Sequence, residues 1–126
     1  MGQEFLIDTN IVIDVFGDIM PNDIKQKVAK MAPVVSAVTY MEALGWHQIT
    51  PRQMDVLKKF MNAAMILPIS RSVMEETVRI RQRKKVGLGD AIIAATAIVH
   101  NRVLVTRNVA DFKSIDNLIV FNPWER

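Results

Sequence analysis

The strongest constraint on the fold is that short apolar, β-branched runs alternate along the chain with longer segments of helical period. The runs lack the polar alternation of a sheet that faces water on one side, so they are typical of strands buried on both faces. Strands are predicted at 4–8, 34–36, 65–69, 103–106 and 118–121. Helices between successive strands require right-handed crossovers, which give a mostly parallel sheet with helices on both faces.

Helical segments fill the intervals between these strands. Helices are predicted at 11–17, 23–31, 37–48, 52–63, 71–86, 90–100 and 109–114. Four prolines fall at the junctions, where a missing N–H is tolerated: Pro21, Pro33, Pro51 and Pro68. The sequence has no internal repeat and no linker, so we predict a single α/β domain over residues 1–126.

Composition narrows the class of protein. Half of the 126 residues are apolar and 23% are charged, which is the balance of a folded globular domain. The absence of cysteine excludes a cysteine-ligated zinc site and a thiol nucleophile. We expect no signal peptide and no membrane contact, because acids interrupt the first apolar residues and no apolar run approaches roughly 18 residues. We therefore expect a cytoplasmic protein, whose net charge of +3 permits a polyanionic partner without requiring one.

The residues that follow the predicted strands are mostly acids. Open α/β sheets bind ligands beyond the carboxyl ends of their strands, so these positions indicate the functional edge. Asp8 ends the first strand in IDTN, and Glu42 lies one turn into the helix after the second. Asp90 begins the helix in GLGDAIIAATAIVHN, whose many alanines permit close packing on the sheet. Asn108 and Asp111 follow the fourth strand in LVTRNVADF.

Each of these acids also has a local explanation. Asp8 is a common helix-entry residue, and Thr39-x-x-Glu42 matches a capping box. Asp90 suits a helix N-terminus, where the helix dipole favours negative charge. Asn108 suits the cap of the short helix at 109–114. Taken one at a time, these structural explanations are as good as a functional one.

Taken together, the same acids point to a metal site. They are remote in sequence but are all directed to one edge of the predicted sheet. Converging carboxylates without matching Lys or Arg repel one another unless a cation neutralises them. Oxygen ligands without cysteine or a ligand-spaced histidine pair favour a hard ion, Mg²⁺ or Mn²⁺. Such a site supports phosphodiester hydrolysis by metal-activated water.

At this point the motif order resembles a known family. The succession DTN, an internal glutamate, GDAIIAATA and LVTRN-x-x-DF is similar to that of the PIN-domain nucleases, and most of all to VapC-type toxins of toxin–antitoxin pairs. The resemblance spans nearly the whole chain, and GDAIIAATA and TRNVADF are its specific parts. It implies a five-stranded parallel sheet, a Mg²⁺- or Mn²⁺-dependent endoribonuclease acting on RNA, a cognate antitoxin partner and a homodimer.

The resemblance also implies roles for individual residues. Asp8, Glu42 and Asp90 would be the core acids. The fourth acidic position of the family falls on Asn108, and Asp111 just beyond it would supply the missing carboxylate. Which of these two completes the metal site, and whether the site holds one ion or two, stays open. The hydroxyl of Thr9 or Thr106 would hold a carboxylate or a metal-bound water.

Cations and one further acid lie outside these motifs. The run RIRQRKK at 79–85 is interpreted mainly as a solvated helix face, with binding of RNA phosphates as the alternative; Arg107 is a further candidate for contact with substrate. The candidates in the run are Arg79, Arg83, Lys84 and Lys85. Asp14, near the end of the first helix, is expected to face solvent.

Two other functions remain in competition with a toxin nuclease. A catalytically weak PIN domain that binds RNA or protein is favoured by Asn108, because one acid fewer weakens the metal site. A phosphoacceptor or nucleotide-binding domain would share the α/β pattern. The chain lacks both G-x-G-x-x-G after the first strand and G-x-x-x-x-G-K-[ST], which removes the usual phosphate-binding loops.

Overall fold

The computed structural model describes residues 4–17, 20–31 and 33–125. Their strands are β1 (Phe5–Ile7), β2 (Val34–Ser36), β3 (Met65–Leu67), β4 (Val103–Val105) and β5 (Val120–Phe121). Their helices are α1 (Thr9–Phe16), α2 (Asn22–Ala29), α3 (Ala37–Leu44), α4 (Pro51–Ala63), α5 (Arg71–Arg83), α6 (Leu88–Val99) and α7 (Val109–Phe112). The predicted alternation of strands and helices is thereby confirmed.

All described strand pairs are parallel. Hydrogen bonds join β1, β4 and β5 into one group, with Leu6 opposite Leu104, and join β2 to β3 in another, with Val35 opposite Ile66. Strand β2 packs beside β1, so the two groups form one continuous layer. The predicted α/β fold is confirmed, although backbone hydrogen bonding divides its five strands into three and two.

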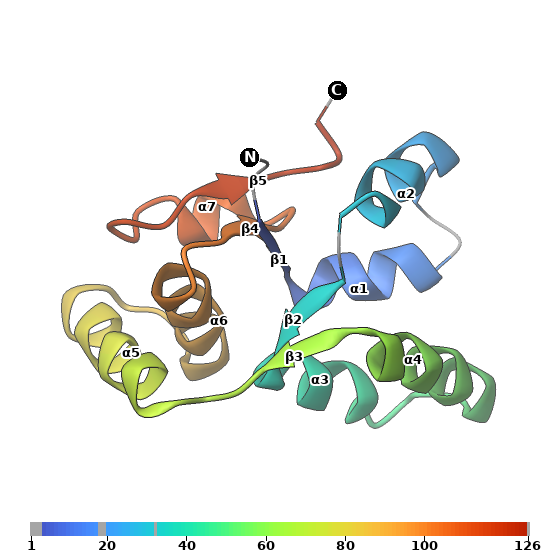
Figure 1. Cartoon of the computed structure of the whole chain (residues 1–126), viewed down its shortest axis with the longest axis horizontal. Coiled ribbons are helices and arrows are strands. Elements are labelled where there is room, and N and C mark those ends of the chain that lie inside the picture. Colours follow the sequence, from blue (N-terminus) through green and yellow to red (C-terminus); the bar gives the residue numbers. More distant parts are fainter. Residues whose placement is uncertain (1–3, 18–19, 32, 126) are drawn as a thin grey trace.

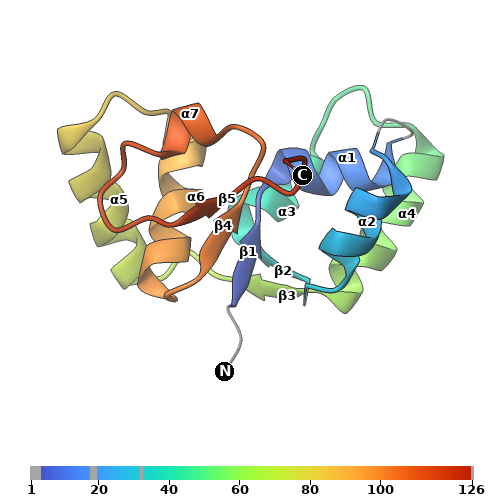
Figure 2. The same ribbon diagram turned by 90° about the horizontal axis from the view of Figure 1, so that it is seen from above.

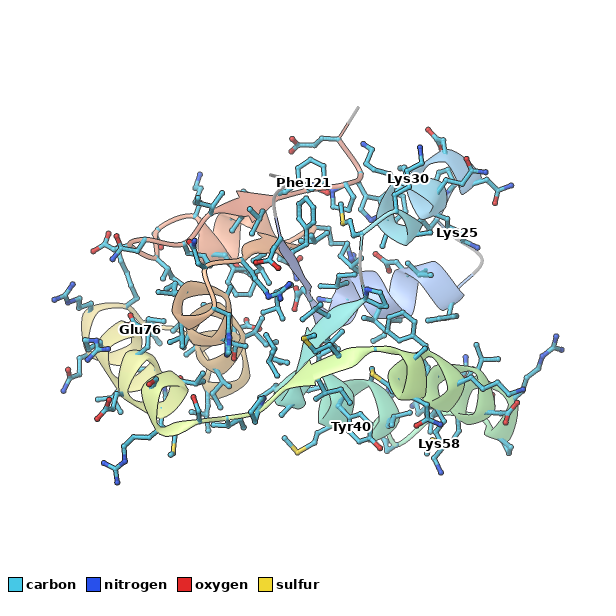
Figure 3. All side chains as sticks on the ribbon, viewed as in Figure 1. Lys25, Lys30, Tyr40, Lys58, Glu76 and Phe121 are labelled. Atoms are coloured by element: carbon cyan, nitrogen blue, oxygen red, sulfur yellow. The ribbon has the colours of Figure 1, made fainter. Side chains whose placement is uncertain are left out.

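Helices cover both faces of this layer. Figures 1 and 2 show α5, α6 and α7 on one side of the strands and α1, α2 and α4 on the other. Charged side chains such as Lys30, directly after α2, and Lys58 of α4 lie on the outer surface of the molecule (Figure 3). None of the helices within the described residues is both long and apolar enough to cross a membrane.

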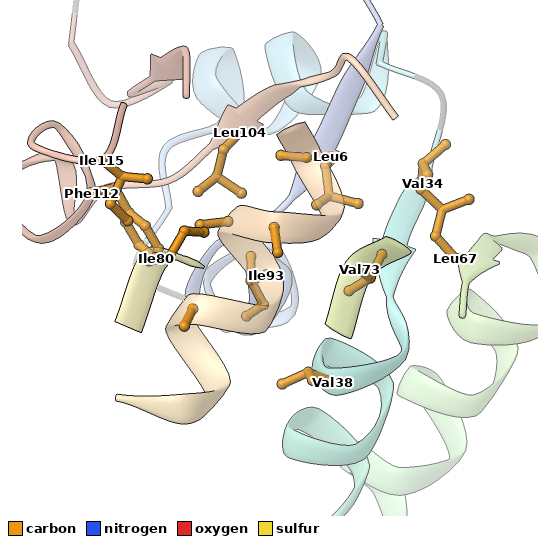
Figure 4. Close-up of a cluster of buried hydrophobic side chains, with 14 residues drawn as sticks. Leu6, Val34, Val38, Leu67, Val73, Ile80, Ile93, Leu104, Phe112 and Ile115 are labelled. Carbon is orange, nitrogen blue, oxygen red and sulfur yellow. The ribbon is translucent and has the colours of Figure 1, made fainter. Parts of the chain in front are cut away.

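Helix α6 packs against the strands through small side chains. Its alanines at 91, 94, 95 and 97 are completely buried. Without long side chains, the helix backbone can approach Leu6 and Leu104, which belong to the same hydrophobic cluster (Figure 4). Helix α5 packs along the other side of α6 through Val73 and Ile80. This dense core fixes the start of α6, and with it Asp90, relative to the end of β1.

Each of the seven helices in the described residues differs from its predicted bounds at one end or both, by one to four residues, and two of these differences have a clear local cause. The first helix begins at Thr9, because Asp8 accepts a hydrogen bond from the Thr9 N–H and occupies the N-cap position. Helix α3 ends at Leu44 and does not extend to residue 48. Gly45 terminates it with an N–H bond to the Met41 carbonyl, where a Cβ would lie 2.5 Å from the carbonyl oxygen.

Candidate metal and catalytic site

Asp8 lies at the junction of β1 and α1 and is only 3% exposed. Its Oδ1 accepts from the Thr9 N–H at 2.8 Å, and its Oδ2 accepts from the Thr106 hydroxyl at 2.8 Å. The parallel register of β1 and β4 pairs Ile7 with Val105, so the residue after each strand reaches its neighbour. Burial, followed by the charges of Asp90 and Glu42, raises the Asp8 pKa from 3.8 to about 6, against the lowering effect of the two hydrogen bonds.

Glu42 is tied to α1 by a side-chain hydrogen bond. The Thr9 hydroxyl donates to its Oε1 at 2.7 Å and lies 3.0 Å from the Thr39 hydroxyl. The capping-box alternative for Thr39 and Glu42 is wrong, because Ser36 caps α3 by accepting from the Thr39 N–H. The Glu42 carboxylate is therefore oriented by a hydroxyl of another helix.

Asp90 lies in the first turn of α6, after Gly87 at the N-cap. Burial raises the pKa of Asp90, and the charges of Glu42 and Asp111 raise it further. The neighbouring Gly89 explains why Glu42 can approach this turn, since a Cβ at Gly89 would lie 2.9 Å from Glu42 Oε2. Any side chain at this position would push the glutamate away from α6.

Asn108 and Asp111 lie at the start of α7. Asn108 occupies the N-cap position but makes no side-chain capping bond, so the predicted cap is wrong. Its backbone N–H donates instead to the Thr106 hydroxyl at 3.0 Å. The Thr106 hydroxyl therefore links Asn108 to Asp8 while being fully buried. Asp111 is exposed, although its charge contributes to the raised pKa of Asp90.

The four carboxylates at this edge influence one another and have no cation partner within the described part of the chain. The ion pairs there all involve other acids. Burial is the largest cause of the raised pKa values of Asp8 and Asp90, and repulsion from the neighbouring carboxylates raises them further. A set of carboxylate oxygens whose charges are uncompensated suits a hard divalent cation in both charge and donor type.

The arrangement is looser than a closed metal cage. Among residues 4–17, 20–31 and 33–125, no three His, Asp or Glu side chains form a group that could hold a metal ion as they stand. Like charges separate when nothing neutralises them, and Glu42 and Asp111 are exposed side chains that can change rotamer. The donor set thus fits a metal in charge and donor type, although its carboxylates are not arranged as a closed set of ligands.

The basic run of α5 pairs with acids outside this edge. Arg79 pairs with Glu76 at 3.0 Å, and Arg83 approaches Asp116 at 3.8 Å. Lys84 and Lys85 are exposed where α5 ends, before the turn that leads to Asp90. These contacts agree with the solvated-face interpretation, and the RNA-binding alternative stays a prediction.

Asp14 does not face solvent, so that expectation is wrong. It is 2% exposed, and its Oδ2 lies 3.0 Å from Arg107 Nε and accepts from Trp124 Nε1 at 3.3 Å. Arg107 comes directly before Asn108, and Trp124 follows β5. Sequence reasoning missed this contact because its three members are remote along the chain. The only available signal was an acid on the apolar face of a helix.

A cavity of about 610 Å³ opens away from the acids. Exposed apolar side chains of α1, α4 and the segment between α3 and α4 line it, among them Ile13, Phe16, Trp46 and Val56. None of the four candidate acids contributes to its wall. Most of its lining residues are apolar, with Thr50, Arg52 and Gln53 among the rest, and no acid or histidine among the described residues lines it.

Comparison with known proteins supports the fold and the motif order together. The family model of the PIN domain matches residues 5–118, which include every candidate acid. The chain belongs to the PIN domain family. The predicted resemblance is thereby confirmed at the level of the family. A comparison with curated proteins gave no match.

Several solved structures share this PIN fold over almost their whole length. A toxin–antitoxin complex from Klebsiella pneumoniae contains a chain that is 34% identical, with a TM-score of 0.80 and coverage of 98% of this chain and 100% of that one. FitAcB from Neisseria gonorrhoeae gives 28% identity, a TM-score of 0.78 and coverage of 97% and 99%. DNA-bound VapBC from Salmonella typhimurium gives 22% identity, a TM-score of 0.83 and coverage of 97% and 99%. At this level of identity, the similarity to VapBC is one of fold alone.

Proposed function

We propose that this PIN domain is a divalent-metal-dependent endoribonuclease and the toxin of a type II toxin–antitoxin pair. The observation that carries the proposal is the group of Asp8, Glu42, Asp90 and Asp111, whose charges meet without a described cation partner. The PIN domain match supports the nuclease class. The toxin–antitoxin complex at 34% identity supports the biological role.

The candidate ligands of Mg²⁺ or Mn²⁺ are Asp8, Asp90, Asp111 and Asn108, with Glu42 as a further acid. A bound divalent ion supplies charge neutralisation for the phosphodiester and lowers the pKa of a water nucleophile. Thr106 donates to one oxygen of Asp8 and so keeps that carboxylate in a single orientation. Thr9 fixes Oε1 of Glu42 and leaves Oε2 directed toward the start of α6.

The cavity between α1 and α4 supports the partner part of the proposal. Its wall includes Ile13 at 44% exposure and Trp46 at 45% exposure, and clustered exposed apolar side chains mark protein contacts more often than free surface. A cognate antitoxin and a second copy of the chain are the two partners that we propose for the protein.

Cleavage of total tRNA and rRNA by the purified, partner-free protein tests the nuclease. We expect cutting with Mg²⁺ or Mn²⁺ and none with EDTA. Asp8→Asn should reduce the rate more than about a hundredfold, because losing a ligand exceeds the 10–100-fold cost of losing an outer-shell partner. Asp55→Asn is the matched control, since Asp55 is an exposed acid of α4 paired with Lys59. Full activity of folded Asp8→Asn would refute the proposed site.

One observation favours a second candidate, a PIN domain that binds RNA or protein without efficient cleavage. Asn108 is neutral and Asp111 is exposed, so the metal site has one buried acid fewer than a fully acidic edge would provide. Titration with Mg²⁺ and Mn²⁺ discriminates the two candidates. An absence of saturable binding at millimolar concentration, together with RNA binding that survives EDTA, would favour the binding module.

A further inference from the structure

Buried Asp14 holds Arg107 at the edge of the acidic site. The two residues come from α1 and from the turn after β4, and Arg107 Nε lies 3.0 Å from Asp14 Oδ2. Asp14 is 2% exposed, whereas the Arg107 side chain is 44% exposed. The contact therefore joins a fully enclosed carboxylate to a guanidinium that reaches solvent.

Hydrogen bonds fix the Asp14 side of this ion pair. Trp124 Nε1 donates to the same Asp14 oxygen at 3.3 Å. The segment around Trp124 is held in turn by Lys27, which donates to the carbonyl oxygens of Pro123 and Glu125 at 3.2 and 3.3 Å. Asp14 thus has a fixed position, and the Arg107 guanidinium is held beside it by the ion pair.

The free part of the guanidinium is suited to an anion. Arg107 has no partner other than Asp14 among the described residues. An arginine held through Nε still presents its two terminal amino groups, the fork that binds a phosphate through two hydrogen bonds. A surface pair placed only for stability gains little by burying its acid so completely, because desolvation offsets the attraction.

Both chain neighbours of Arg107 are hydrogen-bonded at the acidic site. Its neighbour Thr106 donates to Asp8, and its neighbour Asn108 donates to the Thr106 hydroxyl. Along α1, Asp14 lies six residues after Asp8, or about 9 Å at the helical rise of 1.5 Å per residue. The guanidinium, 3.0 Å from Asp14 Oδ2 and next in the chain to Thr106, therefore lies at the same edge of the sheet as the acidic cluster.

We infer that Arg107 binds a backbone phosphate next to the scissile one, and that Asp14 is the positioning residue that holds it there. This inference rests on the proposed action on RNA and adds a specific substrate contact to it. The four carboxylates repel the phosphate backbone, so a fixed cation beside them supplies attraction where the strand must enter. Arg107 contacts RNA in this scheme, and Asp14 acts only through Arg107.

Binding of a fluorescently labelled, single-stranded RNA of mixed sequence in EDTA tests the inference without requiring cleavage. For the full chain carrying Arg107→Ala we expect affinity to fall about tenfold and the slope of log K against log salt to decrease by about one. Arg107→Lys should recover part of the affinity. Lys59→Ala removes the same charge from an exposed pair on α4 and should leave affinity and slope unchanged.

The role of Asp14 is separated by a double-variant cycle. Asp14→Asn alone should weaken binding several-fold, and adding it to Arg107→Ala should cause no further loss, because Asp14 acts through the arginine. The double variant leaves no unpaired buried charge, so it remains usable if Arg107→Ala fails to fold. Wild-type affinity in the folded double variant would overturn the phosphate contact, and equal losses in both backgrounds would overturn the positioning role.

The same measurements distinguish this inference from the nuclease proposal. A protein that does not cleave RNA but loses affinity on Arg107→Ala would retain the phosphate contact and lose the nuclease assignment. A protein that cleaves RNA, and whose affinity is unchanged in folded Arg107→Ala, would retain the nuclease and lose the contact.

Discussion

Asp8 and Asp14 are both almost completely buried on the same helix, but they face groups of opposite charge. Asp8, at the start of α1, receives two neutral hydrogen bonds and the repulsion of Asp90 and Glu42. Asp14, near the end of α1, is paired with Arg107. The second carboxylate is compensated within the chain, and the first is left to be compensated by something else. This contrast is the one expected between an acid that holds a metal ion, as proposed for Asp8, and an acid that positions a cation, as inferred for Asp14.

The largest expected effect concerns the pH dependence of stability at Asp8. Its folded pKa of about 6 exceeds the value of 3.8 for an exposed aspartate, so the folded state retains its proton longer than the unfolded state. The resulting stability is complete below about pH 3.8 and is lost as pH rises through about 6. The loss is about 3 kcal/mol at roughly 1.4 kcal/mol per pKa unit.

Asp8→Asn isolates this contribution. In metal-free protein, the free energy of unfolding of the variant minus that of wild type should rise by about 2 kcal/mol between pH 4 and pH 7, because part of the contribution is already lost at pH 4. Urea unfolding at several pH values measures the difference. A difference that stays constant with pH would show that Asp8 ionises normally and would remove the contrast with Asp14.

Breaking the ion pair between Asp14 and Arg107, near the other end of α1, should lower the free energy of unfolding. Arg107→Ala leaves the Asp14 carboxylate buried with only the Trp124 N–H, so we expect a loss of about 2 kcal/mol, reduced from the full cost of a buried pair because solvent screens the half-exposed arginine. Thermal and urea unfolding at pH 7 measure it, with Lys59→Ala as the exposed control. Unchanged stability would show that Asp14 has another source of compensation.

A smaller effect is expected at Thr106, which donates a hydrogen bond to Asp8 and directly precedes Arg107 in the chain. Thr106→Val keeps the shape of the buried side chain but removes the donor to Asp8 and the acceptor for the Asn108 N–H. We expect a loss of about 1 kcal/mol in stability and a further rise in the Asp8 pKa. Urea unfolding at pH 4 and pH 7 tests both, since the loss should be greater at pH 7, where Asp8 is ionised.

Local sequence signals predicted the helices and strands, because each signal has its own chemical basis. Pro51 follows the capping residue Thr50 at the start of α4, and the predicted and observed helices there differ by one residue. The signals failed where two local rules competed. Thr39 and Glu42 fit a capping box, yet Ser36, the last residue of β2 and three positions before Thr39, caps the helix. Glu42 was then free to accept from Thr9, a residue 33 positions away.

The α/β fold, the family and the set of acids after the strands could be predicted from the amino-acid sequence, because strand and helix period and short motifs are properties of neighbouring residues. Which buried acid is paired with a cation depends on how the elements pack. Asp14 and Arg107 are 93 positions apart in the sequence, and nothing local to either predicts that β4 will bring them within 3.0 Å. Charges act through space, so their pairing is fixed when the chain packs.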